Sequence, residues 1–425
     1  MAQKSVIVVG AGLAGLCCAR TLQREGHSVQ LYEASDGVGG RVRTDSVDGF
    51  LLDRGFQVAL TAYPAMQQEI DFAALKMNAF DPGALVVRDG KRFPISDPLR
   101  MPSKLLSAAL SPLFPFADKL RVLNLRRKLG TRTIDEIFRL PDMPLREYLR
   151  KEGFTDAFFD NFIAPFYGGI FLEREGATSV RMFAFVFKML SEGQTAVPAG
   201  GMGEIGKQIA ADLSPGTLYL SSPVLGLLEE RGRIHGVRLA DGQSVDADAV
   251  VLATDFDQAA ALAGTIIPSL SRVPIVWRIS TTLYFSVPDQ FYTEKLILLF
   301  PANNTLVNNA ALVSNAAPLY APPGLHLLSA TVLGDPKLSV EALIAAVRTE
   351  LGAQFPESDS RTWHPLRVYR IRIAQFAQPS GIWERLPAER TDVPGLVLAG
   401  EYTVSSSLQG AFLSGQRAAQ AVMKA

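Results

Sequence analysis

Apolar and polar positions near the start of the numbering predict a strand, a helix and a second strand in close succession. Residues 5–9 form a β-branched run, and a helical stretch follows up to Arg24, with Gly26 as a helix stop. A second strand-like run covers residues 28–32 and ends at Glu33. The pattern therefore predicts a βαβ unit whose first turn is rich in glycine.

Two later blocks contain further strands and helices of the same kind. The glycine-rich segment 198–206 precedes a predicted helix over 207–213. Strands are then expected at 224–228, 234–239 and 249–253, and a buried strand at 395–401 precedes an alanine-rich helix that opens at 409–415. The three blocks predict one domain that is assembled from separated segments, with other material inserted between them.

The two insertions differ in pattern. Residues 99–195 read as helical, with breaks at proline and many phenylalanines, whereas residues 275–373 alternate as strands do. The strands are expected at 275–285, 296–300, 306–313, 325–333 and 366–373, interrupted by one amphipathic helix over 340–351. The insertions therefore predict a second, α+β domain made of a mixed sheet and a helical part.

The first glycine turn has the spacing of a dinucleotide-binding site. Gly10, Gly12 and Gly15 form GxGxxG between the strand and the helix, and Glu33 lies 23 residues after Gly10. Gly10 and Gly12 let the backbone approach a pyrophosphate at the positive end of the helix, and Gly15 lets the helix pack closely on the strand. Glu33 can accept hydrogen bonds from ribose hydroxyls. An ordinary α/β turn is the alternative, and the strand, helix and acid disfavour it.

Composition excludes several classes of protein. The 425 residues are 48% hydrophobic, which is enough for a large core, and 42 basic residues balance 42 acidic ones, so a nucleic-acid binder is not expected. Cys17 and Cys18 are expected to pack inside the first helix, and four scattered histidines predict no metal site. We expect no signal peptide and no membrane span, and therefore a cytoplasmic protein.

Five motifs in a fixed order, GAGLAG, Glu33, GGRVRT, PAGGMGEIG and LAGEYT…LQGAFLSGQRAA, resemble the FAD-dependent amine oxidase superfamily. That superfamily includes monoamine and polyamine oxidases, protoporphyrinogen oxidase and plant-type phytoene and carotene desaturases. The resemblance implies a Rossmann-like FAD-binding domain from residues 1–75, 196–272 and 385–425. It also implies a substrate domain with a helical part at 76–195 and a mixed sheet at 273–384.

The resemblance further implies a set of cofactor contacts. The pyrophosphate is expected at the glycine turn and Arg41, and the adenosine at Glu33 and Val224. Glu401 is expected to reach the ribityl chain or the pyrophosphate, and the flavin ring is expected beside the loop 53–57 and the last helix. The residues expected to bind FAD are Gly10, Gly12, Leu13, Ala14, Gly15, Glu33, Ala34, Gly39, Gly40, Arg41, Gly55, Phe56, Gln57, Val224, Ala253, Gly400, Glu401, Gln409, Gly410 and Ala411.

Two departures from the amine oxidases point away from an amine substrate. Those enzymes carry two aromatic residues before the flavin; Tyr402 is a candidate for one, but Ser407 stands where the second is expected. Ser280 or Thr281 stands where a lysine is expected. The ending SxxLQGAFLSG is closer to the desaturases, so the preferred prediction is a dehydrogenase or desaturase that passes a hydride from a lipophilic substrate to flavin N5.

Other functions stay open at this stage. The rival enzyme is a flavin amine or amino-acid oxidase, and a third possibility is a flavin-binding scaffold without chemistry. No catalytic residue is identified, and the sequence does not determine the electron acceptor, for which oxygen and a quinone are both candidates. Because only one dinucleotide turn is present, a bound NAD(P) is not implied.

Two stretches have alternative interpretations that the sequence leaves open. The first is an aromatic cluster that either lines a hydrophobic substrate tunnel or packs between helices. Its members are Phe154, Phe158, Phe159, Phe162, Phe166, Tyr167, Phe171, Phe183, Phe185 and Phe187. The second is a basic stretch, Leu99–Arg132, in which eight cations face only Asp118 and leucines and phenylalanines are interleaved. It either contacts an anionic membrane peripherally or forms a solvated helical face.

Overall fold

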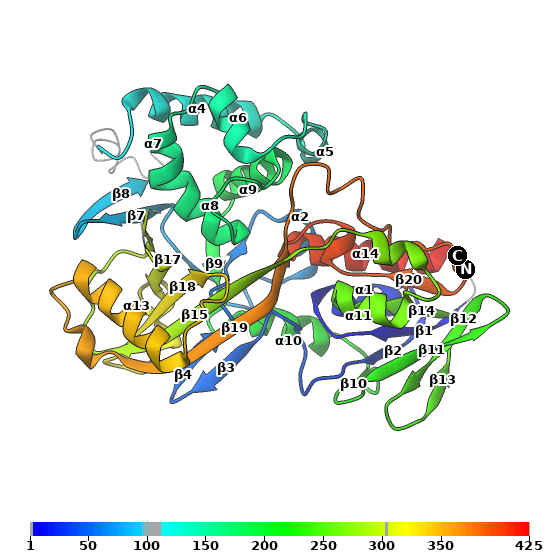
Figure 1. Ribbon diagram of the computed structural model, residues 1–425. Coiled ribbons are helices and arrows are strands. Elements are labelled where there is room, and N and C mark those ends of the chain that lie inside the picture. Colours follow the sequence, from blue (N-terminus) through cyan, green and yellow to red (C-terminus); the bar gives the residue numbers. More distant parts are fainter. Residues whose placement is uncertain (1–2, 97–99, 101–111, 302–304, 425) are drawn as a thin grey trace.

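Five short parallel strands form the first sheet of the computed structural model, which describes residues 3–96, 100, 112–301 and 305–424 (Figure 1). The strands lie in the order β10 (Leu218–Tyr219), β2 (Ser28–Tyr32), β1 (Ser5–Val9), β14 (Ala249–Leu252) and β20 (Leu396–Leu398). β1 pairs with β2 on one side and with β14 on the other. The predicted assembly of this sheet from separated segments is confirmed.

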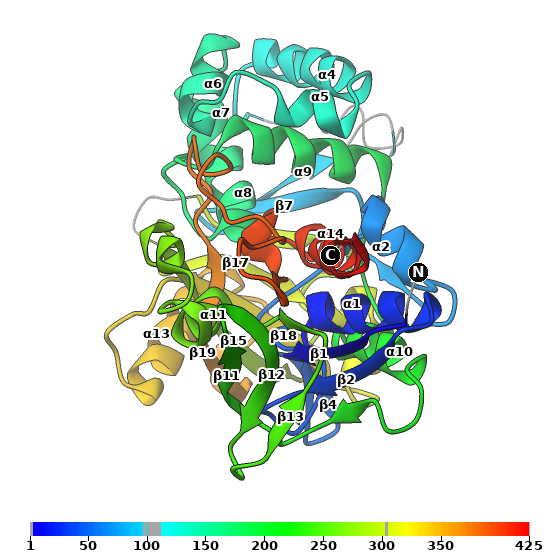
Figure 2. The same ribbon diagram turned by 90° about the vertical axis from the view of Figure 1, so that its right-hand side faces the viewer.

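Alternate side chains of β1 face two different layers, as period-two burial requires. Val6 and Val8 pack in the core that contains α1 (Leu13–Arg24) and α14 (Leu408–Lys424). Ile7 and Val9 face the core formed by β12 (Arg233–Leu239) and α11 (Phe256–Ala263). The meander also contains β11 (Val224–Glu230) and β13 (Ser244–Asp246), and Figure 2 shows it on the side of the sheet opposite α14.

A seven-stranded mixed sheet forms the second domain-like unit. Its order is β19 (His364–Phe376), β15 (Trp277–Val287), β18 (His326–Leu333), β17 (Val307–Leu312), β16 (Ile297–Leu299), β7 (Gly83–Arg88) and β8 (Lys91–Ser96). The helix α13 (Val340–Gln354) packs on one face of this sheet. The five strands and the helix predicted between residues 275 and 373 are confirmed.

The prediction that residues 76–195 are helical is wrong at the start of that segment. β7 and β8 form a hairpin, and β7 also pairs in parallel with β16, more than 200 residues later in the chain. A local sequence pattern cannot show a partner that is so distant in the chain. Pro94 in β8 also argues against a strand, although β8 is an edge strand and therefore tolerates proline. The partition into domains otherwise stays a prediction.

The helix predicted for 207–213 begins earlier, since α10 covers Gly203–Ala211. Because glycine destabilises a helix interior, the sequence pattern places the start of this helix after Gly206 rather than at Gly203. Gly206 is needed there because a Cβ at this position would lie 2.9 Å from Cα of Gly39. α10 therefore packs directly against the glycine segment that follows β2.

A layer of helices covers the remaining side of the molecule and lies above both sheets in Figure 1. It contains α4 (Phe116–Gly130), α5 (Ile134–Phe138), α6 (Leu145–Lys151), α7 (Asp156–Phe158), a π-helical turn (Phe159–Ile163), α8 (Ala164–Phe171) and α9 (Val180–Glu192). The fold also contains α2 (Pro64–Glu69), the antiparallel pair β3 (Thr44–Val47) and β4 (Phe50–Asp53), and the small sheet β5 (Ala59–Leu60), β9 (Thr195–Val197) and β6 (Asn78–Ala79). Short segments complete the fold: α12 (Val313–Ala316) and the 3₁₀ turns Pro268–Arg272, Pro318–Tyr320, Ser360–Thr362 and Glu401–Thr403.

Helix length and composition also bear on membrane topology. Among the described residues, none of the helices combines the length and the apolar character that crossing a bilayer requires.

Candidate functional site

One continuous cavity of about 1230 Å³ runs from the five-stranded sheet to the helical layer. Its floor lies at the carboxyl ends of the parallel strands, where Gly10 follows β1, Glu33 follows β2, Ala253 follows β14 and Gly400 follows β20. From there it passes between the mixed sheet and the helices and reaches α4. Crevices at the carboxyl ends of parallel strands are where α/β folds bind ligands.

The geometry of the glycine turn fits a pyrophosphate. Gly10 has a φ of +103°, and a Cβ on Gly15 would lie 1.9 Å from the Gly10 carbonyl oxygen, so both positions need glycine. A Cβ on Gly12 would meet no protein atom within 4 Å, so this position faces open space. No side chain caps the N-terminus of α1, and its first-turn N–H groups are therefore available to an anion.

The Glu33 carboxylate is held beside the same turn. Its Oε2 accepts a hydrogen bond from the Ala11 N–H at 2.7 Å, and its Oε1 accepts from the N–H and the hydroxyl of Ser35 at 2.9 and 2.7 Å. Oε1 already accepts two hydrogen bonds, whereas Oε2 accepts one and can accept another. Glu33 therefore orders the turn and still has acceptor capacity toward the cavity.

A charged pair lies between the nucleotide end and the middle of the cavity. Arg41 forms an ion pair with Glu401, and the guanidinium lies 6.0 Å from the centroid of the Trp277 ring. The second oxygen of Glu401 accepts a hydrogen bond from the Ser406 hydroxyl at 3.2 Å. Arg41 provides a fixed cation and Glu401 a fixed anion at the place where the sequence predicts the middle of the dinucleotide.

Most residues predicted to contact FAD line this one cavity. They are Gly10, Gly12, Leu13, Ala14, Glu33, Ala34, Gly39, Gly40, Arg41, Gly55, Phe56, Gln57, Val224, Ala253, Gly400, Glu401 and Ala411. Their binding roles stay predictions, but the chemistry of the set fits the two phosphates, the ribose and the adenine of FAD. The structure brings these residues together from separate parts of the chain, at 10–14, 33–41, 55–57, 224, 253 and 400–411.

Three predicted residues do not line the cavity, and each has a packing role. Gly15 joins α1 to β1, as described above. The Gln409 side chain accepts a hydrogen bond from the Ala65 N–H at 2.9 Å and so ties α14 to α2. A Cβ on Gly410 would lie 1.9 Å from the Ser405 carbonyl oxygen, so this glycine allows the chain to enter α14.

The loop Gly55–Gln57 is anchored by a buried carboxylate that the sequence analysis did not single out. Asp53 accepts hydrogen bonds from the Thr44 hydroxyl, from the Met202 N–H and from the Tyr320 hydroxyl, at 2.6, 2.9 and 3.0 Å. The Asp53 carbonyl oxygen accepts from the Tyr284 hydroxyl at 2.9 Å. Burial raises the pKa of Asp53 to about 6, although its three donors act in the opposite direction.

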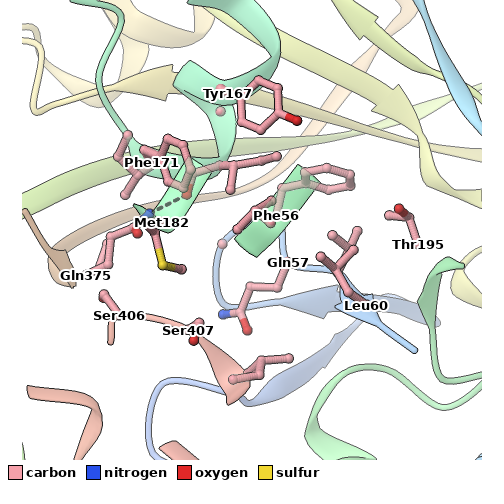
Figure 3. Close-up of a pocket in the computed structure, with 18 of the residues that line it drawn as sticks. Phe56, Gln57, Leu60, Tyr167, Phe171, Met182, Thr195, Gln375, Ser406 and Ser407 are labelled. Carbon is pink, nitrogen blue, oxygen red and sulfur yellow. Dashed lines mark hydrogen bonds between the residues drawn. The ribbon is translucent and has the colours of Figure 1, made fainter. Parts of the chain in front are cut away.

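The middle of the cavity is neutral and largely apolar (Figure 3). Tyr167 and Phe171 from α8 lie across it from Ser407 and Gln57, and Phe56 projects between them. The Gln57 amide nitrogen donates to the carbonyl oxygens of Arg41 and Arg54, at 2.9 and 3.0 Å, so the loop fixes its orientation. None of the ten residues labelled in the figure is charged.

Tyr167 carries the most notable polar atom in this part of the cavity. Its hydroxyl has no hydrogen-bond partner among the described residues, and burial raises the pKa of the phenol, which therefore stays neutral. Tyr167 packs against Phe183, with ring centroids 4.8 Å apart. A polar group of a substrate can therefore form a hydrogen bond with this hydroxyl, whereas an apolar substrate does not need that contact.

Both interpretations of the aromatic cluster apply, to different members. Seven of its residues line the cavity: Phe158, Phe162, Phe166, Tyr167, Phe171, Phe183 and Phe187. Phe154, Phe159 and Phe185 are buried outside it; Phe185, for example, stacks on Tyr63 with ring centroids 5.7 Å apart. The cluster is at once a cavity wall and a helical core.

Two residues considered above for positions typical of amine oxidases, Tyr402 and Thr281, point away from the cavity. Tyr402 is buried against Phe256 on the other side of the chain, with ring centroids 5.4 Å apart, so it is not a cavity aromatic. The Thr281 hydroxyl donates to the Gly334 carbonyl oxygen at 2.7 Å, whereas Ser280 lines the cavity. Ser280 is therefore the residue of this strand that faces the site.

Comparison with known proteins shows a family model, sequences and solved structures that are similar to this chain. The sequence profile of flavin containing amine oxidoreductases matches residues 13–423. A 15-cis-phytoene desaturase from Capsicum annuum is 23% identical over 99% of this chain and 78% of its own length. In structure, an oxidoreductase from Methanosarcina mazei matches with a TM-score of 0.75 and 19% identity over 99% of this chain and 100% of that one. Putrescine oxidase bound to putrescine matches with a TM-score of 0.72 and 18% identity over 100% of both chains.

Proposed function

The chain belongs to the flavin containing amine oxidoreductase family, and on that premise we propose that it is an FAD-dependent dehydrogenase of a lipophilic, uncharged substrate. FAD and oxidoreductase activity follow from the family. The substrate class is the proposal, and its main support is the neutral, aromatic middle of the cavity in Figure 3. The similarity in sequence to phytoene desaturases over nearly the whole chain supports it as well.

A neutral cavity favours a neutral substrate for energetic reasons. Apolar surface contributes about 25 cal/mol per Å² when it leaves water, without needing polar anchors. A protonated amine entering the same space must lose its hydration, and the labelled residues of Figure 3 offer it no carboxylate. Of the acids that line the cavity, Glu401 is already paired with Arg41.

The reaction proposed is a two-electron dehydrogenation. Bound FAD would supply the acceptor for the hydride that one substrate carbon loses. The neighbouring carbon would release a proton, which leaves the cavity for bulk solvent as the C=C bond forms, and oxygen or a quinone would finally take up the two electrons together with the protons. This chain's residues bind and orient. The Gly55–Gln57 loop and Ala411 hold the substrate end of the cofactor site, and the aromatic wall of α8 excludes water from the reacting carbons.

The test is anaerobic reduction of the bound flavin by a panel of candidate substrates. Uncharged polyenes and isoprenoids presented in lipid vesicles are expected to bleach the flavin absorbance. Putrescine, benzylamine and L-amino acids are expected not to. Rapid bleaching by an amine would instead make the protein an amine oxidase, and failure of every compound together with failure of chemical photoreduction would leave a flavin-binding scaffold.

Tyr167→Phe separates the two enzyme classes within the same assay. The change removes one hydroxyl that has no hydrogen-bond partner in the part of the chain that the structure describes, and it keeps the ring that packs on Phe183. A hydrocarbon substrate should then reduce the flavin within about twofold of the wild-type rate. A substrate whose nitrogen or oxygen binds this hydroxyl should lose about tenfold, equivalent to one hydrogen bond of about 1.4 kcal/mol.

A further inference from the structure

The helix α4 carries apolar residues on two opposite faces. Leu125 and Leu129 are buried against the helical layer. Phe116, Leu120 and Leu123 recur at helical spacing on the other side and are 60%, 53% and 40% exposed. This arrangement differs from the simple amphipathic helix expected from the sequence, in which one face is apolar and the other polar.

The exposed stripe lies at the outer end of the substrate cavity. Phe116, Leu120 and Leu123 border the same continuous cavity that reaches the glycine turn of β1. A scattered exposed leucine needs no explanation, whereas three in one stripe at the opening of an apolar cavity form a surface that water solvates poorly. A lipophilic molecule that enters at α4 therefore passes from one apolar surface to another.

Cations surround this stripe. Residues 116–132 contain six basic residues and one acid, Asp118, which is buried and paired with Arg121. Arg127 lies one helical turn beyond Leu123 on the same face of α4. Arg127 and Arg132 are both exposed, and neither has an ion pair among the described residues. Lys128 pairs with Glu152. The remainder of the basic stretch, residue 99 and residues 101–111, lies outside the described residues.

We propose that the α4 surface, defined by Phe116, Leu120, Leu123 and Arg127, inserts into the headgroup region of an anionic lipid bilayer and opens the substrate cavity to the membrane. The apolar stripe supplies burial and the arginine supplies attraction to anionic headgroups. This inference goes beyond the proposed reaction and is measured without turnover, so either can fail alone.

The experiment is vesicle co-sedimentation of the FAD-loaded protein. The vesicles are made of phosphatidylcholine alone or of phosphatidylcholine mixed with phosphatidylglycerol, at low and at high salt. The wild-type protein should bind the mixed vesicles and lose affinity both at high salt and without the anionic lipid. Leu120→Glu should weaken binding at least tenfold and Arg127→Glu at least fivefold.

Matched controls place the same changes elsewhere on the surface. Leu319, which is 68% exposed, and Arg231, on the turn between β11 and β12, lie outside the cavity opening, so Leu319→Glu and Arg231→Glu should bind as the wild type does. Retained flavin absorbance and an unchanged melting temperature show that each variant is folded.

Three outcomes would overturn the proposal. The first is no sedimentation of the wild-type protein with either vesicle. The second is binding that ignores lipid charge, salt and both α4 variants. The third is a dimer in analytical ultracentrifugation that Leu120→Glu dissociates, since the surface would then be an interface between two copies of the chain.

Discussion

At the nucleotide end of the site, the Cβ atom that a glycine lacks determines whether the backbone and a ligand fit together, and Gly12 is the clearest case. Gly10 and Gly15 are required by protein contacts, because a Cβ there would meet backbone atoms of the protein itself. Gly12 has no such neighbour within 4 Å, and its φ of −69° is one that any residue adopts. The structure therefore tolerates a side chain at Gly12, whereas a pyrophosphate against the turn does not.

Gly12→Val is accordingly expected to fold normally and to lose FAD. The valine side chain would occupy the open space in front of the α1 N-terminus. Flavin content after purification, and titration of the apo-protein with FAD, measure the effect. Gly130→Val is the matched control, because this glycine also has no neighbour within 4 Å and lies in α4, far along the chain from the turn. Stoichiometric FAD in Gly12→Val would contradict the assignment.

Asp53 gives a prediction for pH dependence at the same scale. Because burial raises the pKa of Asp53 in the folded protein to about 6, the unfolded chain releases this proton at lower pH than the folded chain does. The contribution of Asp53 to stability therefore falls as pH rises from about 4 to about 6, by about 3 kcal/mol, and stays constant above that. Denaturant unfolding of the wild type and of Asp53→Asn across this range measures it. A stability difference that does not change with pH would exclude the ionisation of Asp53 as its source.

At the scale of elements, Asp53 shows how two sheets are joined at the cofactor loop. Asp53 is the last residue of β4. Its carboxylate accepts hydrogen bonds from Thr44 in β3, from the N–H of Met202 just before α10, and from Tyr320, which follows β17 in the chain. The loop Gly55–Gln57 leaves directly from this junction. The same polar cluster that fixes the loop therefore connects the nucleotide-binding segments to the mixed sheet.

Removing one donor from this junction should destabilise the protein, whereas removing an unpartnered hydroxyl should not. Tyr320→Phe leaves the Asp53 carboxylate short of a donor in a buried place, with an expected cost of about 1–3 kcal/mol and weaker FAD binding. Tyr402→Phe is the control, because the Tyr402 hydroxyl is buried without a partner in the described chain and its loss should cost about nothing. Equal effects of the two changes in thermal unfolding would show that the junction contributes no stability.

These elements also show what sequence can predict. Gly10, Gly12 and Glu33 belong to one βαβ unit, so their spacing along the chain already reflects their positions in space. Asp53 and Tyr320 are 267 residues apart, and no local pattern relates them. β7 escaped prediction for the same reason, since its parallel partner β16 lies in the other insertion. Tyr402 was a reasonable candidate by position, but the direction of its side chain depends on Phe256, which is also distant in sequence.

At the scale of the whole molecule, the cofactor site and the substrate cavity share one continuous space between the two sheets. Its walls come from the five-stranded sheet, the mixed sheet and the helical layer together. A ligand that fills the nucleotide end therefore contacts segments from residue 10 to residue 411 at once. Binding should then stabilise the entire fold rather than one part of it.

FAD is accordingly expected to raise the unfolding temperature of the apo-protein. At a free FAD concentration one hundred times the dissociation constant, the stabilisation is about 2.7 kcal/mol, or about 3 °C for a chain of this size. Differential scanning calorimetry with and without FAD measures the shift, and Gly12→Val should show none. A second transition that FAD leaves unmoved would show that one unit unfolds independently of the site.

The order of the strands in the five-stranded sheet also has a consequence during protein synthesis. β1 and β2 leave the ribosome early, but β14 and β20, which complete the sheet, follow hundreds of residues later, and Ala411 at the cavity later still. At about 5–20 residues per second, roughly 20–80 s separate the synthesis of Gly10 from that of Ala411. Until β14 has been synthesised, roughly 12–48 s after Gly10 at the same rate, the edge of β1 that pairs with β14 stays open to other strands. The nascent chain therefore exposes an unpaired strand edge during this interval, and its cofactor site is complete only after Ala411 has been synthesised.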